Sequence, residues 1–225
     1  MAEVAVAPAA GRVVLVAGAT GLVGREVLAA LLADNSTRTV HCVGRRASGV
    51  RHAKIVDHVV ADFSAMPNLP ALDGVYIALG TTIRLAGSRA AFRAVDFDAV
   101  VAVARAARSA GTTRLGVVSA MGADAGSKVF YNRVKGEMEQ AIAGLGFASV
   151  VLARPSLIDG DRAALAQLSR TAEGLGLRLM RLLRPLIPAN YRAVHAADIA
   201  RTMVRAVQQG QAGVRVILSG ELQPS

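Results

Sequence analysis

Aromatic residues are scarce in this chain: they make up 4% of its 225 residues, and tryptophan is absent. Aromatic rings are the platforms on which nucleic-acid bases stack, so their scarcity weakens a nucleic-acid-binding interpretation of the net charge of +10. The charge comes mostly from arginines scattered along the chain, and no nucleic-acid-binding motif occurs. We therefore predict no nucleic-acid partner and assign the basic charge to solvation and electrostatic steering.

Cysteine is almost absent as well. The single cysteine, Cys42, cannot form an internal disulfide, and it falls in a predicted strand, where a small buried hydrophobic side chain is its expected role. Chains with so little cysteine are typical of reducing compartments. The sequence therefore favours a cytoplasmic location.

Long apolar runs and metal-ligand spacings are missing too. Arg, Gly or Asp interrupts every apolar run before it reaches the roughly eighteen residues of a membrane span, so we predict no stable membrane insertion. His41, His52 and His58 are scattered around Asp57 and Asp62 without the spacing of metal ligands. We predict no metal site.

The sequence does contain a regular alternation of short apolar runs with helical patterns. Nearly continuous apolar, β-branched runs are typical of strands buried on both faces of a parallel sheet. They occupy residues 12–17, 39–43, 54–60, 74–79, 114–119 and 148–153, and helical patterns occupy residues 22–33, 88–110 and 130–144. This alternation predicts an α/β fold with a doubly wound parallel sheet, the Rossmann fold, in strand order 3-2-1-4-5-6 with a ligand at the carboxyl ends of the strands.

Two segments depart from this alternation. The connection GRRASGVRHA, residues 44–53, is short for a crossover helix, so we expect a brief turn or a degenerate helix there. Residues 162–192, rich in Leu, Arg and Pro, predict a small C-terminal cap on the substrate side, followed by a helix near 196–209 and a strand near 213–218. No linker separates the cap, so we predict a single NAD(P)-binding domain over residues 1–225.

The first apolar run leads into a glycine-rich turn, GATGLVG, at residues 18–24. Gly18 permits a tight turn, Gly21 lets the backbone approach a pyrophosphate, and Gly24 allows close packing of helix on strand. The helix that follows presents its N-terminal N–H groups and the positive end of its dipole to the phosphate. The predicted dinucleotide contacts are Gly18, Thr20, Gly21, Leu22, Val23 and Gly24. A structural turn without a ligand is the alternative.

The end of the second predicted strand indicates which dinucleotide is bound. NAD sites usually place an acidic side chain there, bonded to the ribose 2′-hydroxyl. Here the strand ends in Gly44, Arg45 and Arg46, and two guanidinium groups favour a 2′-phosphate. We predict NADP(H) as the cofactor and disfavour NAD(H); in the alternative, Arg45 and Arg46 are solvated loop charges.

A candidate proton-transfer set surrounds the next helix. Tyr131 and Lys135 stand four residues apart in YNRVK, on one face of the predicted helix, and Ser119 ends the strand before it. A free tyrosine titrates near 10, so a neighbouring cation is needed to favour its phenolate. Ser119 is suited to hold a substrate oxygen by a hydrogen bond. We predict all three as catalytic residues; an exposed Tyr–Lys pair without function is the alternative.

Several motifs together resemble one known family. They are GATGLVG, VGRR, ALGTT, VVSAMGAD, YNRVKGEME and ARPSLIDGDR. The chain resembles the short-chain dehydrogenase/reductase superfamily in its atypical, extended-like branch. Within that branch it is similar to the oxidoreductase group of the human Tat-interactive protein, which includes many bacterial NAD(P)H-binding proteins. The resemblance covers about residues 12–205. It implies a cofactor and a reaction class but no substrate.

The resemblance also implies further site residues. Asp62 and Phe63 look like adenine contacts, and Ala78, Leu79, Gly80 and Thr81 look like the loop that lines the cofactor ribose. Pro155, Leu157 and Ile158 match the stretch whose backbone meets the nicotinamide amide, and Tyr131 and Lys135 match cofactor contacts besides their catalytic roles. The family's asparagine on the long helix before the fifth strand has no match in residues 90–107, so a water relay from Lys135 lacks its usual partner.

Together these features favour an NADPH-dependent oxidoreductase that reduces a small-molecule carbonyl, or oxidises an alcohol, by hydride transfer with Tyr131 as acid and base. Two alternatives stay open. One is an NADPH-sensing regulatory protein with a protein partner and little turnover, and the other is an epimerase or dehydratase with a tightly held cofactor. The intact Tyr–Lys pair argues against a pure sensor, because sensing requires no proton transfer.

Overall fold

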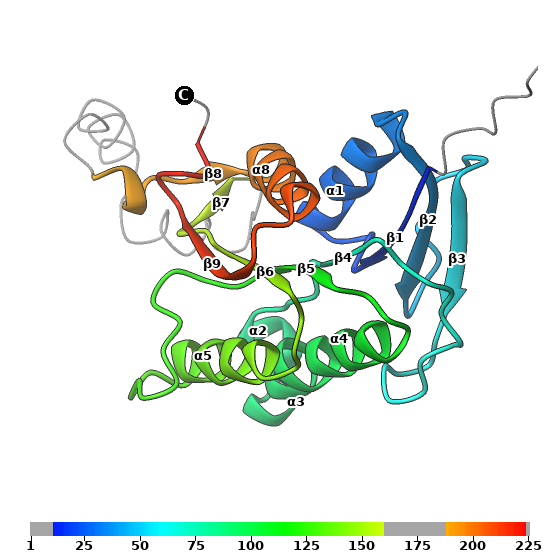
Figure 1. Cartoon of the computed structure of the whole chain (residues 1–225). Helices are drawn as coiled ribbons and strands as arrows, with labels where there is room; N and C mark the ends of the chain where they lie inside the picture. Colours follow the sequence, from blue (N-terminus) through cyan, green and yellow to red (C-terminus); the bar gives the residue numbers. More distant parts are fainter. Residues whose placement is uncertain (1–10, 160–187, 224–225) are drawn as a thin grey trace, which may run out of the picture.

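A seven-stranded parallel sheet forms the centre of the computed structural model, which describes residues 11–159 and 188–223 (Figure 1). The strands lie in the order β3-β2-β1-β4-β5-β6-β9. They are β1 (Arg12–Ala17), β2 (Thr37–Gly44), β3 (Ile55–Val59), β4 (Gly74–Ile77), β5 (Arg114–Val118), β6 (Ser149–Arg154) and β9 (Gly213–Leu218). The predicted Rossmann order is confirmed, and β9 extends the sheet beside β6.

Helices cover both faces of the sheet. On one face, α1 (Leu22–Ala33) packs beside α8 (Ala196–Gln209); on the other lie α4 (Val100–Ser109) and α5 (Phe130–Ala143) (Figure 1). Successive side chains of a strand point to opposite faces, so a strand between two helical layers is apolar at nearly every position. In β1, Val14 and Val16 join the hydrophobic core under α1 and α8, whereas Leu15 and Ala17 join the opposite core.

The helical pattern at residues 88–110 is not one continuous α-helix. After a short α2 (Ile83–Ala86), α3 (Arg89–Arg93) begins at Ser88, whose hydroxyl accepts a hydrogen bond from the N–H of Ala91. It leads into a π-helical turn, η1 (Ala94–Ala99), and then into α4. A π-turn rotates the residues that follow it relative to an α-helix, and such turns are frequent at functional sites. The sequence pattern gave no sign of it.

The remaining elements are short. The connection between β2 and β3 contains no helix, as its length predicts. A two-stranded sheet pairs β7 (Ile158–Asp159) with β8 (Val194–His195), and a 3-10 turn, η3 (Ala189–Tyr191), precedes β8. Of the predicted cap, residues 162–187 lie outside the described residues. No helix in the described part of the chain is both long and apolar enough to cross a membrane.

Candidate cofactor site and proton-transfer residues

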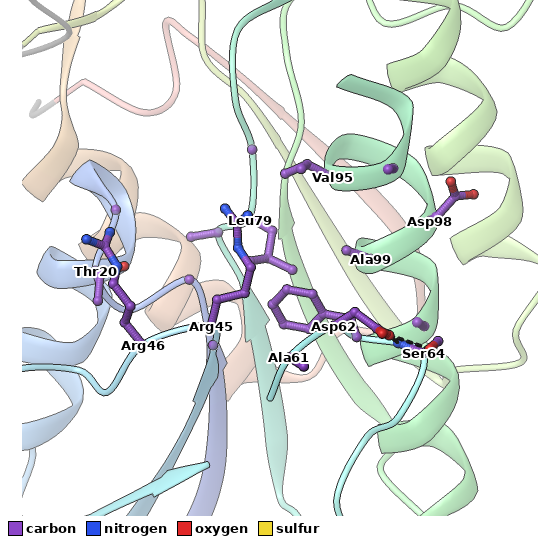
Figure 2. A pocket seen from close by; sticks show the side chains of 18 residues that line it. Thr20, Arg45, Arg46, Ala61, Asp62, Ser64, Leu79, Val95, Asp98 and Ala99 are labelled. Atoms are coloured by element: carbon purple, nitrogen blue, oxygen red, sulfur yellow. Dashed lines mark hydrogen bonds between the residues drawn. The ribbon is translucent and has the colours of Figure 1, made fainter. Parts of the chain in front are cut away.

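A cavity of about 570 Å³ lies at the carboxyl ends of β1, β2 and β4 (Figure 2). Doubly wound sheets bind ligands at this edge. Ten residues predicted as cofactor contacts line it: Gly18, Thr20, Gly21, Arg45, Arg46, Asp62, Phe63, Ala78, Leu79 and Gly80. The sequence did not indicate the rest of the wall, which is Gly44, Ala61, Ser64, Ala94, Val95, Asp98, Ala99 and Ala102. Most of these have short side chains from η1 and α4, and no motif marks such residues.

Two glycines of the turn after β1 have structural reasons to be glycine. Gly18 has a φ of 87°, in the left-handed region, and a Cβ there would lie 2.7 Å from the carbonyl oxygen of Ala78. A Cβ on Gly24 would lie 2.0 Å from the carbonyl oxygen of Gly18. The turn is therefore tight and α1 packs closely on it, the two properties for which the sequence predicted these glycines.

The N-terminus of α1 adjoins the cavity. Gly21 is the N-cap residue, no side chain caps the helix, and its first turn holds no acidic residue. Unpaired N–H groups and the positive end of the helix dipole therefore stand beside Thr20 and Gly21 in the cavity wall. The side chain of Val23 is buried in the hydrophobic core and that of Leu22 packs against it while partly exposed, and neither residue lines the cavity.

Arg45 and Arg46 follow β2 and extend along one side of the cavity (Figure 2). Both side chains are exposed, and neither has a hydrogen-bond or ion-pair partner among the described residues. Asp62 also belongs to the wall. Its carboxylate accepts hydrogen bonds from the hydroxyl and the backbone N–H of Ser64, and these hold the pKa of Asp62 below its usual range. The cavity thus offers two unpaired guanidinium groups and two carboxylates, of which that of Asp62 is already hydrogen-bonded and that of Asp98 is exposed.

Lys135 forms a buried ion pair behind the cavity wall. Its Nζ lies 2.7 Å from Oδ1 of Asp96, and the two side chains are 4% and 1% exposed. The other carboxylate oxygen, Oδ2, accepts the backbone N–H of Thr81 at 2.8 Å. A Cβ on Gly80 would lie 3.3 Å from Oδ1 of Asp96 and 3.9 Å from Nζ of Lys135. The ion pair therefore stands against the loop after β4 that lines the cavity. Thr81 itself is outside the lining and anchors Asp96.

Tyr131 lies on the first turn of α5, one turn before Lys135. It is half-buried, and its ring contacts the ring of Phe92 on α3 with centroids 5.4 Å apart. Residues four apart on a helix are neighbours on one face. Neither Tyr131 nor Lys135 lines the cavity. Lys135 lies against the loop after β4, and Tyr131 lies one helical turn before Lys135.

Ser119 follows β5 and is buried against α5. Its hydroxyl donates a hydrogen bond to Oε1 of Glu139, and Glu139 in turn forms a two-point ion pair with the guanidinium group of Arg154 at the end of β6. A serine hydroxyl has one proton to donate. In this arrangement Ser119 offers a substrate only its lone pairs. Sequence analysis missed Glu139 and Arg154, although Glu139 stands four residues after Lys135 on α5.

The residues after β6 have backbone partners of their own. The carbonyl of Pro155 accepts the N–H of Met121 at 2.9 Å, and the carbonyl of Leu157 accepts the N–H of Val194 at 2.8 Å. Ile158 opens β7 and packs against the core. The structure does not bring Pro155, Leu157 or Ile158 into the cavity wall.

Two of the scattered histidines do meet. His41 on β2 and His58 on β3 stack, with Nδ1 of the first 2.8 Å from Nε2 of the second. Burial, and then the neighbouring His58, lower the pKa of His41. Among the described residues, no group of three or more His, Cys, Asp or Glu side chains is arranged to hold a metal ion.

A family model described as NAD(P)H-binding matches residues 18–210 of the chain. The chain belongs to this NAD(P)H-binding family. The predicted resemblance to short-chain dehydrogenases/reductases agrees with solved structures of that class, which share the fold of this chain. The narrower resemblance to the group of the Tat-interactive protein stays a prediction.

Among curated relatives, the chain is 36% identical over 167 residues to the protein named fmp52, mitochondrial, from Emericella nidulans, and the match covers 70% of each chain. Further relatives carry the same mitochondrial name. The prediction of a cytoplasmic location was wrong, because these relatives are named as mitochondrial. The prediction rested on a single buried cysteine, which is compatible with any reducing compartment.

Solved structures share the fold at low sequence identity. A short-chain dehydrogenase family protein from Francisella tularensis has a TM-score of 0.71 and 14% identity, covering 94% of this chain and 99% of that one. A UDP-N-acetylglucosamine 4-epimerase from Methanobrevibacter ruminantium has a TM-score of 0.66 and 13% identity, covering 92% and 76%. The fold therefore occurs both in oxidoreductases and in epimerases, and function must be argued from the site.

Proposed function

We propose that this protein is an NADPH-dependent oxidoreductase that reduces a carbonyl compound or oxidises the matching alcohol. One observation carries the proposal. The ammonium group of Lys135 lies 3.9 Å from the Cβ position of Gly80 in the cavity wall, and it is one helical turn from Tyr131. A single helix thus links the cofactor loop to a tyrosine, the arrangement that couples cofactor binding to proton transfer.

In this proposal the bound nicotinamide supplies the hydride, and the residues of the chain supply binding and the proton. The N-terminus of α1, at Thr20 and Gly21, binds the pyrophosphate. The hydroxyl of Tyr131 donates a proton to the carbonyl oxygen as that oxygen gains negative charge, and the ammonium of Lys135 stabilises the phenolate that remains. Ser119, whose proton is directed at Glu139, accepts a hydrogen bond from the product hydroxyl.

The preference for NADPH rests on Arg45 and Arg46. Both line the cavity at the end of β2, where a cofactor ribose is expected, and both lack a protein partner in the described residues. A 2′-phosphate gives such guanidinium groups a charge-assisted partner, whereas a 2′-hydroxyl does not. The carboxylate of Asp62 already accepts two hydrogen bonds from Ser64, which leaves it less available to bind a ribose hydroxyl.

An epimerase is the second candidate, favoured by the structural likeness to a nucleotide-sugar epimerase. The two candidates differ in the fate of the cofactor. An oxidoreductase consumes NADPH in proportion to product, whereas an epimerase returns its hydride to the same substrate and consumes none. A regulatory NADPH sensor differs from both, because it binds the cofactor and transforms no substrate.

The test is hydride transfer to a panel of aldehydes, ketones and quinones. NADPH carrying deuterium at its transferable position is incubated with the protein and each carbonyl, and the product is examined by mass spectrometry. The proposal expects deuterium in at least one alcohol product, with NADPH consumed in equal amount. Binding without transfer supports the sensor, and isomerisation of a sugar nucleotide without net consumption supports the epimerase; either result contradicts the proposal.

A further inference from the structure

The buried partner of Lys135 changes the electrostatics of the site. We propose that Asp96 offsets the positive charge of Lys135 and thereby limits how far that charge favours the phenolate of Tyr131 over the phenol that donates a proton to a carbonyl. The inference rests on the proposed function, since it concerns the tyrosine that function uses. It makes Asp96 a positioning residue that acts through Lys135.

The geometry isolates this ion pair from solvent. Both side chains are almost fully buried, and the charged atoms are 2.7 Å apart. Oδ1 of Asp96 makes no hydrogen bond in the described part of the structure, so the ion pair is its polar contact. Oδ2 is fixed by the N–H of Thr81. Charges that are held at contact distance away from water interact strongly and are screened little by salt.

The π-turn η1 brings Asp96 to this position. Asp96 is buried, while its neighbours Val95 and Phe97 are partly buried and Asp98 is exposed. A π-turn alters the direction in which successive side chains of a helix point, and a helix with such a turn is less favourable than a regular one. This irregular turn contacts α5, and it is the element from which Asp96 reaches Lys135.

The acidic side chains of α5 itself are paired with arginines. Glu137 pairs with Arg93 of α3 and with Arg133, and Glu139 pairs with Arg154 of β6. Arg89 and Arg133 lie over the ring of Phe130, and Asp124 lies in the loop before α5. Among the described residues, Asp96 is the acidic side chain in ion-pair contact with Lys135. Its carboxylate therefore sets how much of the lysine charge Tyr131 experiences.

The effect of Asp96 on the pKa of Tyr131 has a definite direction. A neighbouring cation favours phenolate and lowers the pKa of a tyrosine, and an anion beside that cation offsets the effect. Replacing Asp96 by asparagine keeps the shape and an oxygen acceptor for Thr81, but leaves the charge of Lys135 unopposed. The pKa of Tyr131 should then fall by about one unit. Removing both charges, in Asp96→Asn with Lys135→Met, should return the pKa to the wild-type value.

The chain is well suited to a direct titration. It has no tryptophan and three tyrosines, Tyr76, Tyr131 and Tyr191. Burial raises the pKa of Tyr76 above its ordinary value, and Tyr191 is 63% exposed. The near-ultraviolet absorbance of tyrosinate, followed against pH and compared with the same titration of Tyr131→Phe, isolates the transition of Tyr131. No substrate is needed.

The experiment titrates the cofactor-free wild-type protein, Asp96→Asn, the double variant, and Glu137→Gln as a matched control. Glu137 is two residues from Lys135 on the same helix, is partly exposed, and pairs with arginines instead. The expected result is a lower pKa of Tyr131 in Asp96→Asn only. An unchanged pKa in that variant overturns the inference, as does a double variant whose pKa departs from wild type by about one unit. If Asp96→Asn fails to fold, Lys135→Met replaces it: loss of the cation leaves the carboxylate of Asp96 unopposed and should raise the pKa of Tyr131, and an unchanged pKa there overturns the inference. Failure here leaves the hydride-transfer test of the proposed function unaffected.

Discussion

Replacing both Arg45 and Arg46 by alanine should remove most of the preference for NADPH over NADH. A charge-assisted hydrogen bond contributes roughly 1.5–3 kcal/mol. Both guanidinium groups line the cavity but are exposed, so water reduces the contribution of each. We therefore expect a total of about 1.4–3 kcal/mol, which is roughly tenfold to 150-fold in the ratio of dissociation constants. The loss should appear as weaker NADPH binding with NADH binding unchanged.

The assay is fluorescence titration of both reduced cofactors against wild type, the double variant and Arg51→Ala. Arg51 is exposed in the same connection after β2 but lies outside the cavity lining, so its replacement should leave the preference intact. The preference should also shrink as salt rises, because exposed phosphate–arginine contacts are screened. Equal affinities of the wild type for the two cofactors would refute the reasoning, and so would a preference that survives in the double variant.

Three further predictions concern the framework around the site. Gly24→Ala should destabilise the protein by about 3 kcal/mol or more in urea unfolding, since the new Cβ would lie 2.0 Å from the carbonyl oxygen of Gly18. The control Gly144→Ala should change stability by less than about 0.5 kcal/mol, because the atom nearest to its new Cβ is 3.6 Å away. Cys42, whose pKa burial raises to about 12, should resist thiol reagents in the folded protein and react once the protein is unfolded in urea; rapid labelling of the native protein would contradict the buried position. The pKa of Asp34 is lowered to about 2, below the ordinary 3.8, mainly by the hydrogen bond from the Ser36 hydroxyl. The stability that the Asp34 carboxylate contributes is therefore present above about pH 4 and is lost as pH falls through 2. Asp34→Asn should accordingly lower the free energy of unfolding by about 1–2 kcal/mol at neutral pH and by little near pH 2, as measured by urea unfolding at both pH values; an equal loss at the two pH values would show that the ionisation of Asp34 does not matter.

The fold was largely predictable because each central strand is buried on both faces. Apolar residues at nearly every position, as in β1 after Arg12, distinguish such strands from the helices between them. The strand ends were less predictable. The apolar run at residues 74–79 continues past the end of β4 at Ile77, because Ala78 and Leu79 are apolar residues of the loop that lines the cavity. Hydrophobicity alone does not separate a strand residue from a cavity residue.

The buried hydrogen-bond and ion-pair partners of the site residues were the hardest to predict. The motifs marked Lys135 and Ser119 as site residues. Their partner residues were not marked, because Asp96 belongs to no motif and Glu139, although it ends YNRVKGEME, has no role that the motif indicates. The partner of Lys135 depends on the π-turn η1, which the helical periodicity does not reveal. The Ser119–Glu139–Arg154 network joins the loop after β5, the helix α5 and the end of β6, which meet only in the folded protein. Side-chain pairing of this kind is a property of tertiary packing rather than of local sequence.

The central claim is that Tyr131 transfers the proton in an NADPH-dependent reduction. The most direct test compares wild type with Tyr131→Phe in two measurements, NADPH-dependent turnover of a responsive carbonyl and NADPH affinity. The variant keeps the ring that contacts Phe92 and removes only the hydroxyl. The account predicts that turnover falls by about 10²-fold or more while NADPH affinity stays within about twofold. Turnover by Tyr131→Phe at the wild-type rate would contradict it.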